Sequence, residues 1–128
     1  MPSDLKPRKP SPSAQSVGQE KERLAERFLL GKRLELIARN HRCRFGEIDL
    51  VMRDGGVLVF VEVRYRRSAQ HGSAAETVDV RKQRRLIKTA GHYLQYNPTS
   101  RPCRFDVVAI TGDDQVQWIR NAFVLDAV

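Results

Sequence analysis

Hydrophobic and polar residues alternate most clearly between residues 46 and 66, where two apolar runs flank Gly55-Gly56. This pattern predicts a β-hairpin with a two-residue turn. With Gly55-Gly56 as the turn, Asp54 lies opposite Val57. The same register continues away from the turn with the opposed pairs Val51–Phe60, Asp49–Glu62 and Glu47–Arg64.

Alternate side chains of the hairpin share a face. One face is apolar almost throughout and carries Ile48, Leu50, Met52, Val57, Val59, Val61, Val63 and Tyr65. The other face is apolar near the turn but charged at its far end, where Asp49 opposes Glu62. Opposed carboxylates repel each other, and apolar strands solvate them poorly. A divalent cation between the two would remove both penalties, so the hairpin is a candidate metal site.

The hairpin residues also allow two other interpretations. Antiparallel sheets often keep one wet face, so Glu47 could pair with Arg64 and leave Asp49 and Glu62 in solvent. A three-residue turn would instead place Asp49 opposite Val61 and separate it from Glu62. The hairpin pattern alone is compatible with all three arrangements.

The remaining pattern predicts two helices, over residues 20–30 and 80–96, and three strands, over 33–42, 104–111 and 116–120. Asp79 is a suitable N-cap for the second helix. Its apolar stripe consists of Leu86, Ile87, Ala90, Tyr93 and Leu94. Residues 67–78 read as a polar loop, and structureless loops of this length are often functional. Residues 1–19 lack an apolar period and predict a disordered basic tail before one domain over residues 20–128.

The 128 residues suffice for one domain with a core of its own. No run of about 18 apolar residues occurs, so neither a transmembrane helix nor a membrane partner is expected. No apolar stretch follows the basic residues near the start, which argues against a secretory signal. Cys43 and Cys103 have no ligand-pair spacing and are expected to be small buried residues in a reducing cytosol. The expected location is cytoplasmic.

The chain has 23 basic and 15 acidic residues, a net charge of +8. Such an excess favours a polyanionic partner, nucleic acid before membrane, although a merely soluble basic protein is an alternative. Cations crowd the first half of the second predicted helix, at Arg81, Lys82, Arg84, Arg85 and Lys88. Cations near a helix N-terminus oppose its dipole, so local stability does not explain them. A phosphate backbone would explain them, and a solvated face is the alternative.

Five stretches within residues 22–110 together resemble the bacterial YraN family, which is similar to archaeal Holliday-junction resolvases. They are LAERFL, ARNHRCRFGEIDLV, VFVEVRYR, RKQRRLIKTAGHYL and RFDVVAI. The spacing of Asp49 and Glu62-Val63-Arg64 also resembles the restriction-endonuclease-like superfamily motif. In that motif an Asp is followed by Glu or Asp, any residue and then Lys. Arg64 departs from it.

The resemblance implies an α/β, restriction-endonuclease-like fold with a central mixed β-sheet flanked by helices. It also implies a catalytic site of Glu22, Asp49, Glu62 and Arg64, in which Asp49 and Glu62 hold Mg²⁺ or Mn²⁺. Glu22 matches a first-helix glutamate that often completes such sites. Lys82 matches a lysine that opens the basic helix. Arg64 is always protonated, so it can stabilise anionic charge but cannot act as a base.

These expectations define three hypotheses about function. The first is a metal-dependent nuclease acting on DNA, including branched or damaged DNA, because carboxylate-held cations activate water and offset charge on phosphate. The Val63 carbonyl is a third ligand in this hypothesis. The second is a non-catalytic nucleic-acid-binding module that retains the fold, and the third is a structural protein whose carboxylates pair with arginines. Resolvase-like relatives suggest a homodimer by analogy of fold.

Overall fold

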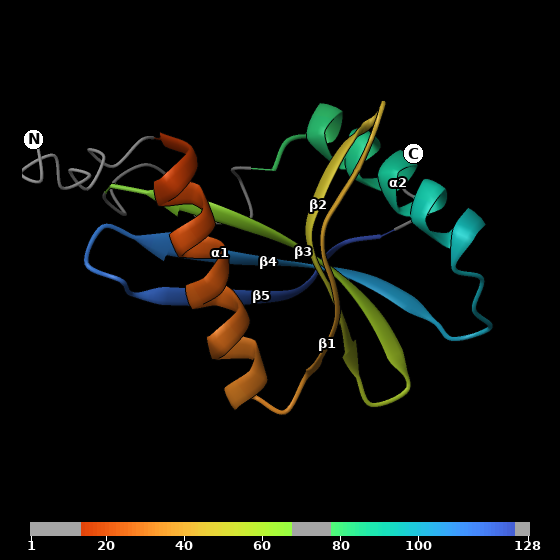
Figure 1. Cartoon of the computed structure of the whole chain (residues 1–128), viewed down its shortest axis with the longest axis horizontal. Coiled ribbons are helices and arrows are strands. Elements are labelled where there is room, and N and C mark those ends of the chain that lie inside the picture. Colours follow the sequence, from red (N-terminus) through yellow and green to blue (C-terminus); the bar gives the residue numbers. More distant parts are fainter. Residues whose placement is uncertain (1–13, 68–77, 125–128) are drawn as a thin grey trace, which may run out of the picture.

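Five strands form one sheet in a computed structural model of the chain, which describes residues 14–67 and 78–124. The strand order is β1-β2-β3-β4-β5 (Figure 1). β3 and β4 run parallel and the other neighbours antiparallel, so the sheet is mixed. A parallel pair needs a crossover, which α2 supplies. The elements are α1 (Ala14–Gly31), β1 (Glu35–Cys43), β2 (Gly46–Asp54), β3 (Val57–Arg66), α2 (Val80–Tyr96), β4 (Cys103–Thr111) and β5 (Val116–Phe123).

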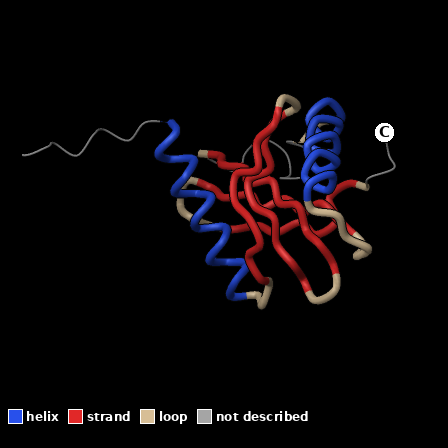
Figure 2. Tube along the Cα trace, turned by 45° about the vertical axis from the view of Figure 1, so that its right-hand side comes forward, coloured by secondary structure: helices blue, strands red, loops and turns tan. Residues whose placement is uncertain are grey.

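The two helices pack against different faces of the sheet (Figure 2). Ala25 and Leu29 of α1 join one apolar cluster, together with Leu50 and Val61 of the sheet. The predicted apolar stripe of α2 joins a second cluster that contains Val51, Leu58, Phe60 and Phe105. The predicted α/β architecture, a mixed sheet flanked by helices, is therefore confirmed at this level.

The predicted hairpin register is confirmed near its turn and ends earlier than predicted. The paired positions run from the turn as Asp54–Val57, Arg53–Leu58, Met52–Val59, Val51–Phe60 and Leu50–Val61. Beyond Leu50–Val61 the strands separate, and β2 continues beside β1 toward α2 while β3 continues beside β4 (Figure 1). Asp49 and Glu62 are the first residues after the separation.

The separation corrects two predictions about the far end of the hairpin. Glu47 does not lie opposite Arg64, because the ladder between β2 and β3 ends at Leu50–Val61, and Glu47 pairs only on its other side, with Arg42 of β1. Ile48 was predicted to share the face of Leu50, but it packs in the cluster beneath α2. The physical reason is the twist of β2, which turns with β1 away from β3 and brings new side chains to each helix.

Helix α2 has the predicted limits, and its N-cap is Asp79, whose Oδ1 accepts a hydrogen bond of 2.8 Å from the backbone N of Lys82. Helix α1 begins at Ala14, so residues 14–19, assigned to the tail, are helical. Once a helix is nucleated, each added residue forms another hydrogen bond, and no proline opposes the extension here. The remaining tail, residues 1–13, and most of the predicted loop, residues 68–77, lie outside the described residues. Within the described ranges, neither helix is long and apolar enough to cross a membrane.

Asp106 ties the last two strands together. Its fully buried carboxylate accepts hydrogen bonds from Arg104, from Trp118 Nε1 at 2.9 Å and from the backbone N of Asn121 at 2.9 Å. The ladder between β4 and β5 shifts register beside Asp106, between Phe105 and Val107. Trp118, predicted to be a packing residue at the sheet edge, also meets Phe28 of α1 edge to face. The two cysteines are half-buried and free, rather than buried as predicted.

Replacing Asp106 with Ala is expected to lower the free energy of unfolding by about 3 kcal/mol, because it leaves buried donors unpaired. Urea unfolding followed by circular dichroism measures the change. The control is Glu35→Ala, which removes an exposed carboxylate paired only with Arg53 at the surface and should change stability by less than about 1 kcal/mol. Equal effects of the two substitutions would contradict a structural role of Asp106.

Candidate active site

Asp49 lies at the point where β2 and β3 separate. It is 8% exposed, and its Oδ2 accepts a hydrogen bond of 2.8 Å from the backbone N of Val63. Glu62, 6% exposed on β3, shares a side-chain hydrogen bond with Asp49. The structure thus brings the two predicted metal ligands together. They are not a pair of the β2–β3 ladder, because the ladder ends one residue before them. The separation opens room between the strands that paired strands would close.

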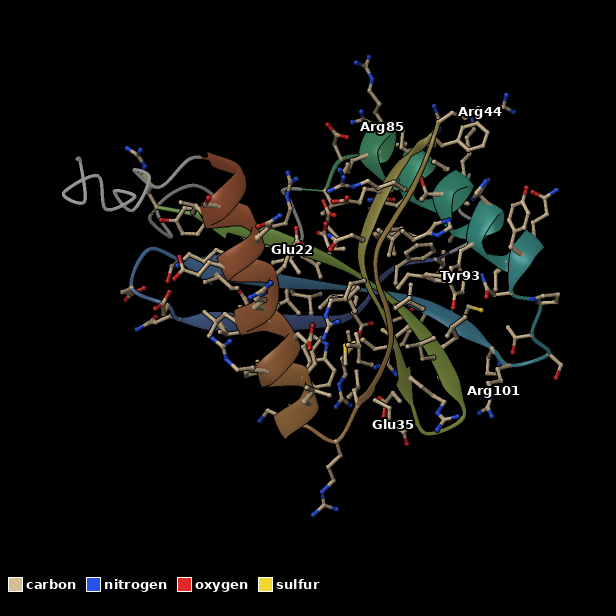
Figure 3. All side chains as sticks on the ribbon, viewed as in Figure 1. Glu22, Glu35, Arg44, Arg85, Tyr93 and Arg101 are labelled. Carbon is tan, nitrogen blue, oxygen red and sulfur yellow. The ribbon has the colours of Figure 1, made fainter. Side chains whose placement is uncertain are left out.

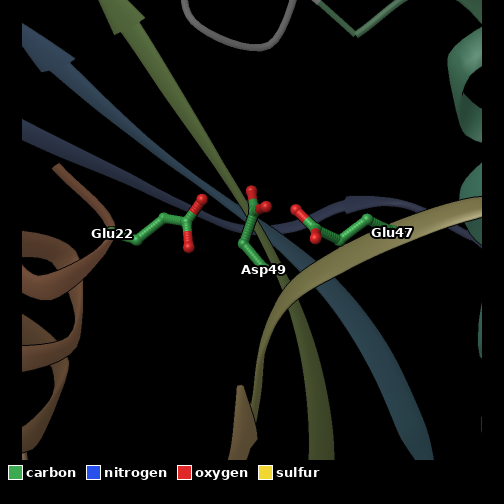
Figure 4. Close-up of side chains that lie close together, drawn as sticks. All are labelled: Glu22, Glu47 and Asp49. Carbon is green, nitrogen blue, oxygen red and sulfur yellow. The ribbon is translucent and has the colours of Figure 1, made fainter. Parts of the chain in front are cut away.

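Two further carboxylates converge on Asp49 (Figure 4). Carboxylate oxygens of Glu22, Glu47 and Asp49 all lie within 4.8 Å of one another. Glu22 reaches across from α1, and Asn40 Nδ2 of β1 donates a hydrogen bond of 2.7 Å to its Oε1. We call Glu22, Glu47, Asp49 and Glu62 the acidic cluster.

Glu47 was not among the predicted site residues. The sequence held one signal for it, because Glu47 precedes Asp49 by two positions on the same strand and therefore points to the same side. Its predicted pairing with Arg64 hid that signal. In the structure Glu47 forms an ion pair with Arg42, and it also lies close to the carboxylates of Glu22 and Asp49.

Two cations stand beside the cluster on the side of Glu62. Arg64 Nη1 and Lys82 Nζ each lie 3.4 Å from Glu62 Oε2. Arg64 belongs to β3, as predicted, whereas Lys82 reaches in from the first turn of α2. Lys82 was predicted to contact nucleic acid. The structure places its ammonium beside Glu62, and the contact with nucleic acid stays a prediction. The other predicted nucleic-acid contacts are exposed on α2, namely Arg81, Arg84, Arg85 and Lys88.

The environment of the acidic cluster raises the pKa of Asp49. Burial and the negative charge of Glu62 raise the pKa of Asp49 to about 9, although the backbone N–H of Val63 acts in the opposite direction. The raised pKa favours the protonated form of Asp49 at neutral pH, and the hydrogen bond with Glu62 suits that form. Any cation that binds there must displace that proton, so its affinity rises with pH.

The donor set fits a hard divalent cation. Mg²⁺ and Mn²⁺ prefer oxygen ligands, and all four side chains of the cluster offer carboxylate oxygens. Oxygens on opposite sides of Mg²⁺ are about 4 Å apart, because each lies about 2 Å from the ion. The spread of 4.8 Å among Glu22, Glu47 and Asp49 is close to that requirement. Small side-chain rotations would complete the fit.

The fold and the site together define a mixed α/β domain with an acidic cluster, two of whose carboxylates are buried and two half-buried, beside a basic helix. A model of the family described as "Uncharacterised protein family UPF0102" matches residues 21–110, and the chain belongs to this family. UPF0102 proteins of Nitrosospira multiformis and Aeromonas hydrophila are 52% and 53% identical to it. The first alignment covers 83% of this chain and 91% of the relative, and the second covers 88% of each. A UPF0102 protein of Stutzerimonas stutzeri is 54% identical over 86% of this chain and 96% of its own length.

The raised pKa of Asp49 predicts an unusual pH dependence of stability. An unfolded aspartate ionises near pH 3.8, whereas folded Asp49 ionises near 9, so the folded state loses stability as pH rises between these values. Asp49→Asn keeps the hydrogen bonds without the charge. At pH 7 in chelator it is expected to raise the free energy of unfolding by about 3 kcal/mol, and the gain should vanish near pH 4.

Urea unfolding at several pH values measures this difference between Asp49→Asn and wild type. The control, Glu35→Gln, changes an exposed carboxylate and should follow wild type within about 0.5 kcal/mol throughout. A less stable Asn variant at pH 7 would show that Asp49 acts as an ionised partner of a neighbouring cation, contrary to the geometry of the site.

Proposed function

We propose that this protein is a metal-dependent nuclease that acts on DNA, with a restriction-endonuclease-like fold. The observation that carries the proposal is the acidic cluster itself, four carboxylates drawn from α1, β2 and β3 with two cations at 3.4 Å from one of them. Carboxylates this close repel one another, and the net charge of +8 shows that the chain has few acidic residues relative to basic ones. A group of carboxylates at one point therefore indicates a ligand rather than composition alone. The resemblance to resolvases favours branched DNA as the substrate, and the homodimer stays a prediction.

Each residue of the site has a distinct role in this proposal. Glu22, Glu47, Asp49 and Glu62 would hold Mg²⁺ or Mn²⁺. When bound, the ion supplies a Lewis acid for the phosphoryl oxygen and lowers the pKa of a water molecule. Arg64 and Lys82 contact the side of the cluster where they can bind the phosphate oxygens.

Lys82 offers what Arg64 lacks. Position 64 departs from the superfamily motif by carrying Arg, whereas Lys82 brings a lysine ammonium to the same carboxylate. Lys82 Nζ lies at the same distance from Glu62 Oε2 as the Arg64 guanidinium, 3.4 Å. We therefore assign to Lys82 the orientation of the attacking water and to Arg64 the stabilisation of charge on the phosphate.

A second candidate function, a non-catalytic nucleic-acid-binding module, has support from one specific observation. Each carboxylate of the cluster already has a partner within the chain. Glu47 pairs with Arg42 and Glu62 with Arg64 and Lys82, while Glu22 and Asp49 accept hydrogen bonds from Asn40 Nδ2 and from the backbone N of Val63. Such a site is stable without an ion. The two candidates share a nucleic-acid partner and differ in metal binding and cleavage.

Cleavage and calorimetry with Mn²⁺ separate the candidates. With branched, single-stranded and duplex DNA, wild type is expected to bind Mn²⁺ and cleave, and Asp49→Asn to lose both. Glu47→Gln and Lys82→Ala are each expected to reduce cleavage by about 100-fold or more, because each removes a group held beside the reacting phosphate. Arg64→Lys should retain cleavage.

The control for Lys82→Ala is Lys32→Ala, which removes an exposed lysine outside α2 and should leave cleavage of saturating DNA unchanged. DNA binding without any Mn²⁺ binding or cleavage would overturn the nuclease proposal in favour of the binding module. Full activity of Lys82→Ala would remove Lys82 from the mechanism but leave the metal site intact.

The exposed cations of α2 predict the salt dependence of DNA binding. Replacing Arg81, Arg84 and Arg85 together with Ala is expected to weaken binding to all sequences alike. It should flatten the slope of log K against log salt by about 2 to 3, because each lost phosphate contact removes about 0.9. Fluorescence anisotropy at several salt concentrations measures both effects.

The control removes the same charge from another part of the molecule. Lys32, Arg33 and Arg101 are exposed cations outside α2. Figure 3 shows Arg101 at the opposite end of the molecule from Arg44 and Arg85. Replacing these three by Ala should change the slope little. Equal effects of the two triple substitutions would mean that net charge, rather than α2, governs binding.

A further inference from the structure

The turn between β1 and β2 carries an aromatic residue that the turn itself does not need. Cys43 pairs with Gly46, so the turn consists of Arg44 and Phe45. Two-residue hairpin turns favour Asn, Asp and Gly, and local propensity does not explain a phenylalanine here. The backbone N of Phe45 donates a hydrogen bond of 3.4 Å to Cys43 Sγ, and Gly46 adopts a φ of +147°. Cys43 and Gly46 thus determine the turn conformation, and Phe45 is not required for it.

Phe45 belongs to neither apolar cluster of the core and is half-buried. Two cations lie next to its ring instead. The Arg44 guanidinium lies 4.8 Å from the ring centroid, and Lys88 Nζ of α2 lies 5.8 Å from it. Figure 2 shows this turn beside α2, and Figure 3 shows Arg44 and Arg85 at the same end of the molecule. An aromatic face among positive charges suits a partner that is both planar and anionic.

The ring also adjoins the acidic cluster. One small hollow between the turn and α2 is lined by Phe45, Glu47, Lys82 and Arg85, among other residues. Glu47 belongs to the acidic cluster and follows Phe45 by only two residues. Lys82 contacts Glu62 of the same cluster. A ligand seated on Phe45 is therefore adjacent to the carboxylates, and Lys82 and Arg85 flank the path between them.

We propose that Phe45 stacks on an unpaired nucleobase next to the phosphate that the acidic cluster receives. This inference rests on the proposed function and specifies its substrate as a nucleic acid with unpaired nucleotides at the site. In an intact duplex each base is stacked and paired and exposes no face, so a protein ring can stack only on a base that has left the helix. Single-stranded segments expose such faces, and aromatic rings bind them without sequence preference. The cations around the ring disfavour a basic or apolar peptide as the occupant.

Comparing unpaired with duplex DNA tests the proposal in chelator, where no cleavage occurs. The full chain is titrated into a labelled duplex and into the same duplex with a flap of unpaired thymidines. Phe45→Leu, which keeps an apolar side chain without a π face, is expected to weaken flap binding about 5- to 100-fold and duplex binding less than twofold. Phe45→Tyr should retain the preference. The matched control is Tyr96→Leu, an exposed aromatic at the far end of α2, which should retain it too.

A spectroscopic variant covers the case in which Phe45→Leu folds poorly. The chain has one tryptophan, so Phe45→Trp adds a single new fluorophore at the turn. Flap DNA is expected to quench this added fluorescence and plain duplex to leave it unchanged. Equal loss of flap and duplex affinity in Phe45→Leu, or no quenching in Phe45→Trp, would overturn the stacking proposal. The stacking proposal would also be overturned if wild type bound neither DNA. It would be overturned as well if the Phe45 variants weakened binding to an apolar peptide and left DNA binding unchanged.

The test also separates this inference from the proposed function. Cleavage with Mn²⁺ depends on the acidic cluster and is measured on the same substrates. A flap preference that Phe45→Leu abolishes, in a wild type that never cleaves, would support stacking and overturn the nuclease. Cleavage by wild type with no effect of Phe45 on the flap preference would overturn stacking and leave the nuclease standing.

Discussion

Everything at the site depends on one electrostatic constraint, the placement of Asp49 and Glu62 together in a nearly dry position. Two ionised carboxylates cannot remain there unless a proton or a cation lies between them. The surrounding structure is arranged around this constraint. The ladder of β2 and β3 ends just before the pair, the N–H of Val63 turns to Asp49, and Arg64 and Lys82 approach Glu62. The site is thus locally destabilising, and the rest of the fold must supply the stability that offsets it.

This stability comes from the two apolar clusters on either side of the sheet. Ala25 and Leu29 anchor α1 on one face, and Leu86, Ala90 and Tyr93 anchor α2 on the other. Each helix then extends a charged residue past its apolar stripe, Glu22 from α1 and Lys82 from α2. The crossover from β3 to β4 contains α2, and Lys82 in the first turn of that helix contacts Glu62 of β3. The helices therefore both stabilise the domain and deliver opposite charges to one point.

The sequence predicted the elements and the hairpin turn because those depend on local periodicity and on Gly55-Gly56. Helix α2 was predicted to the residue, since Asp79 and Asn97 mark its ends. The start of α1 was missed because weak helix formers can extend a helix that is anchored elsewhere. Ladder pairing was extrapolated too far, because periodicity carries no information about where two strands diverge.

The candidate site was predicted in part for the same reasons. Asp49, Glu62 and Arg64 share a short hairpin, so their proximity was predictable from the chain itself, although the ladder ends one residue before Asp49 and Glu62. Glu47 was assigned to the wrong neighbour when the register was extended beyond Leu50–Val61. The contact of Lys82 with Glu62 was not predicted, because only the crossover geometry brings the two residues together. Contacts that join distant segments were accessible from resemblance, as for Glu22, and otherwise only from the structure.

The raised pKa of Asp49 has a consequence for how the sequence changes over generations. Most residues resist replacement because their loss weakens the fold, but here a single change to asparagine would strengthen it at neutral pH. Random mutation can therefore replace Asp49 with asparagine without loss of thermodynamic stability, so selection for stability does not preserve the carboxylate. A lineage that keeps the aspartate does so against that gradient. Persistence of this carboxylate would then record selection on what the protein does and not on how well it folds.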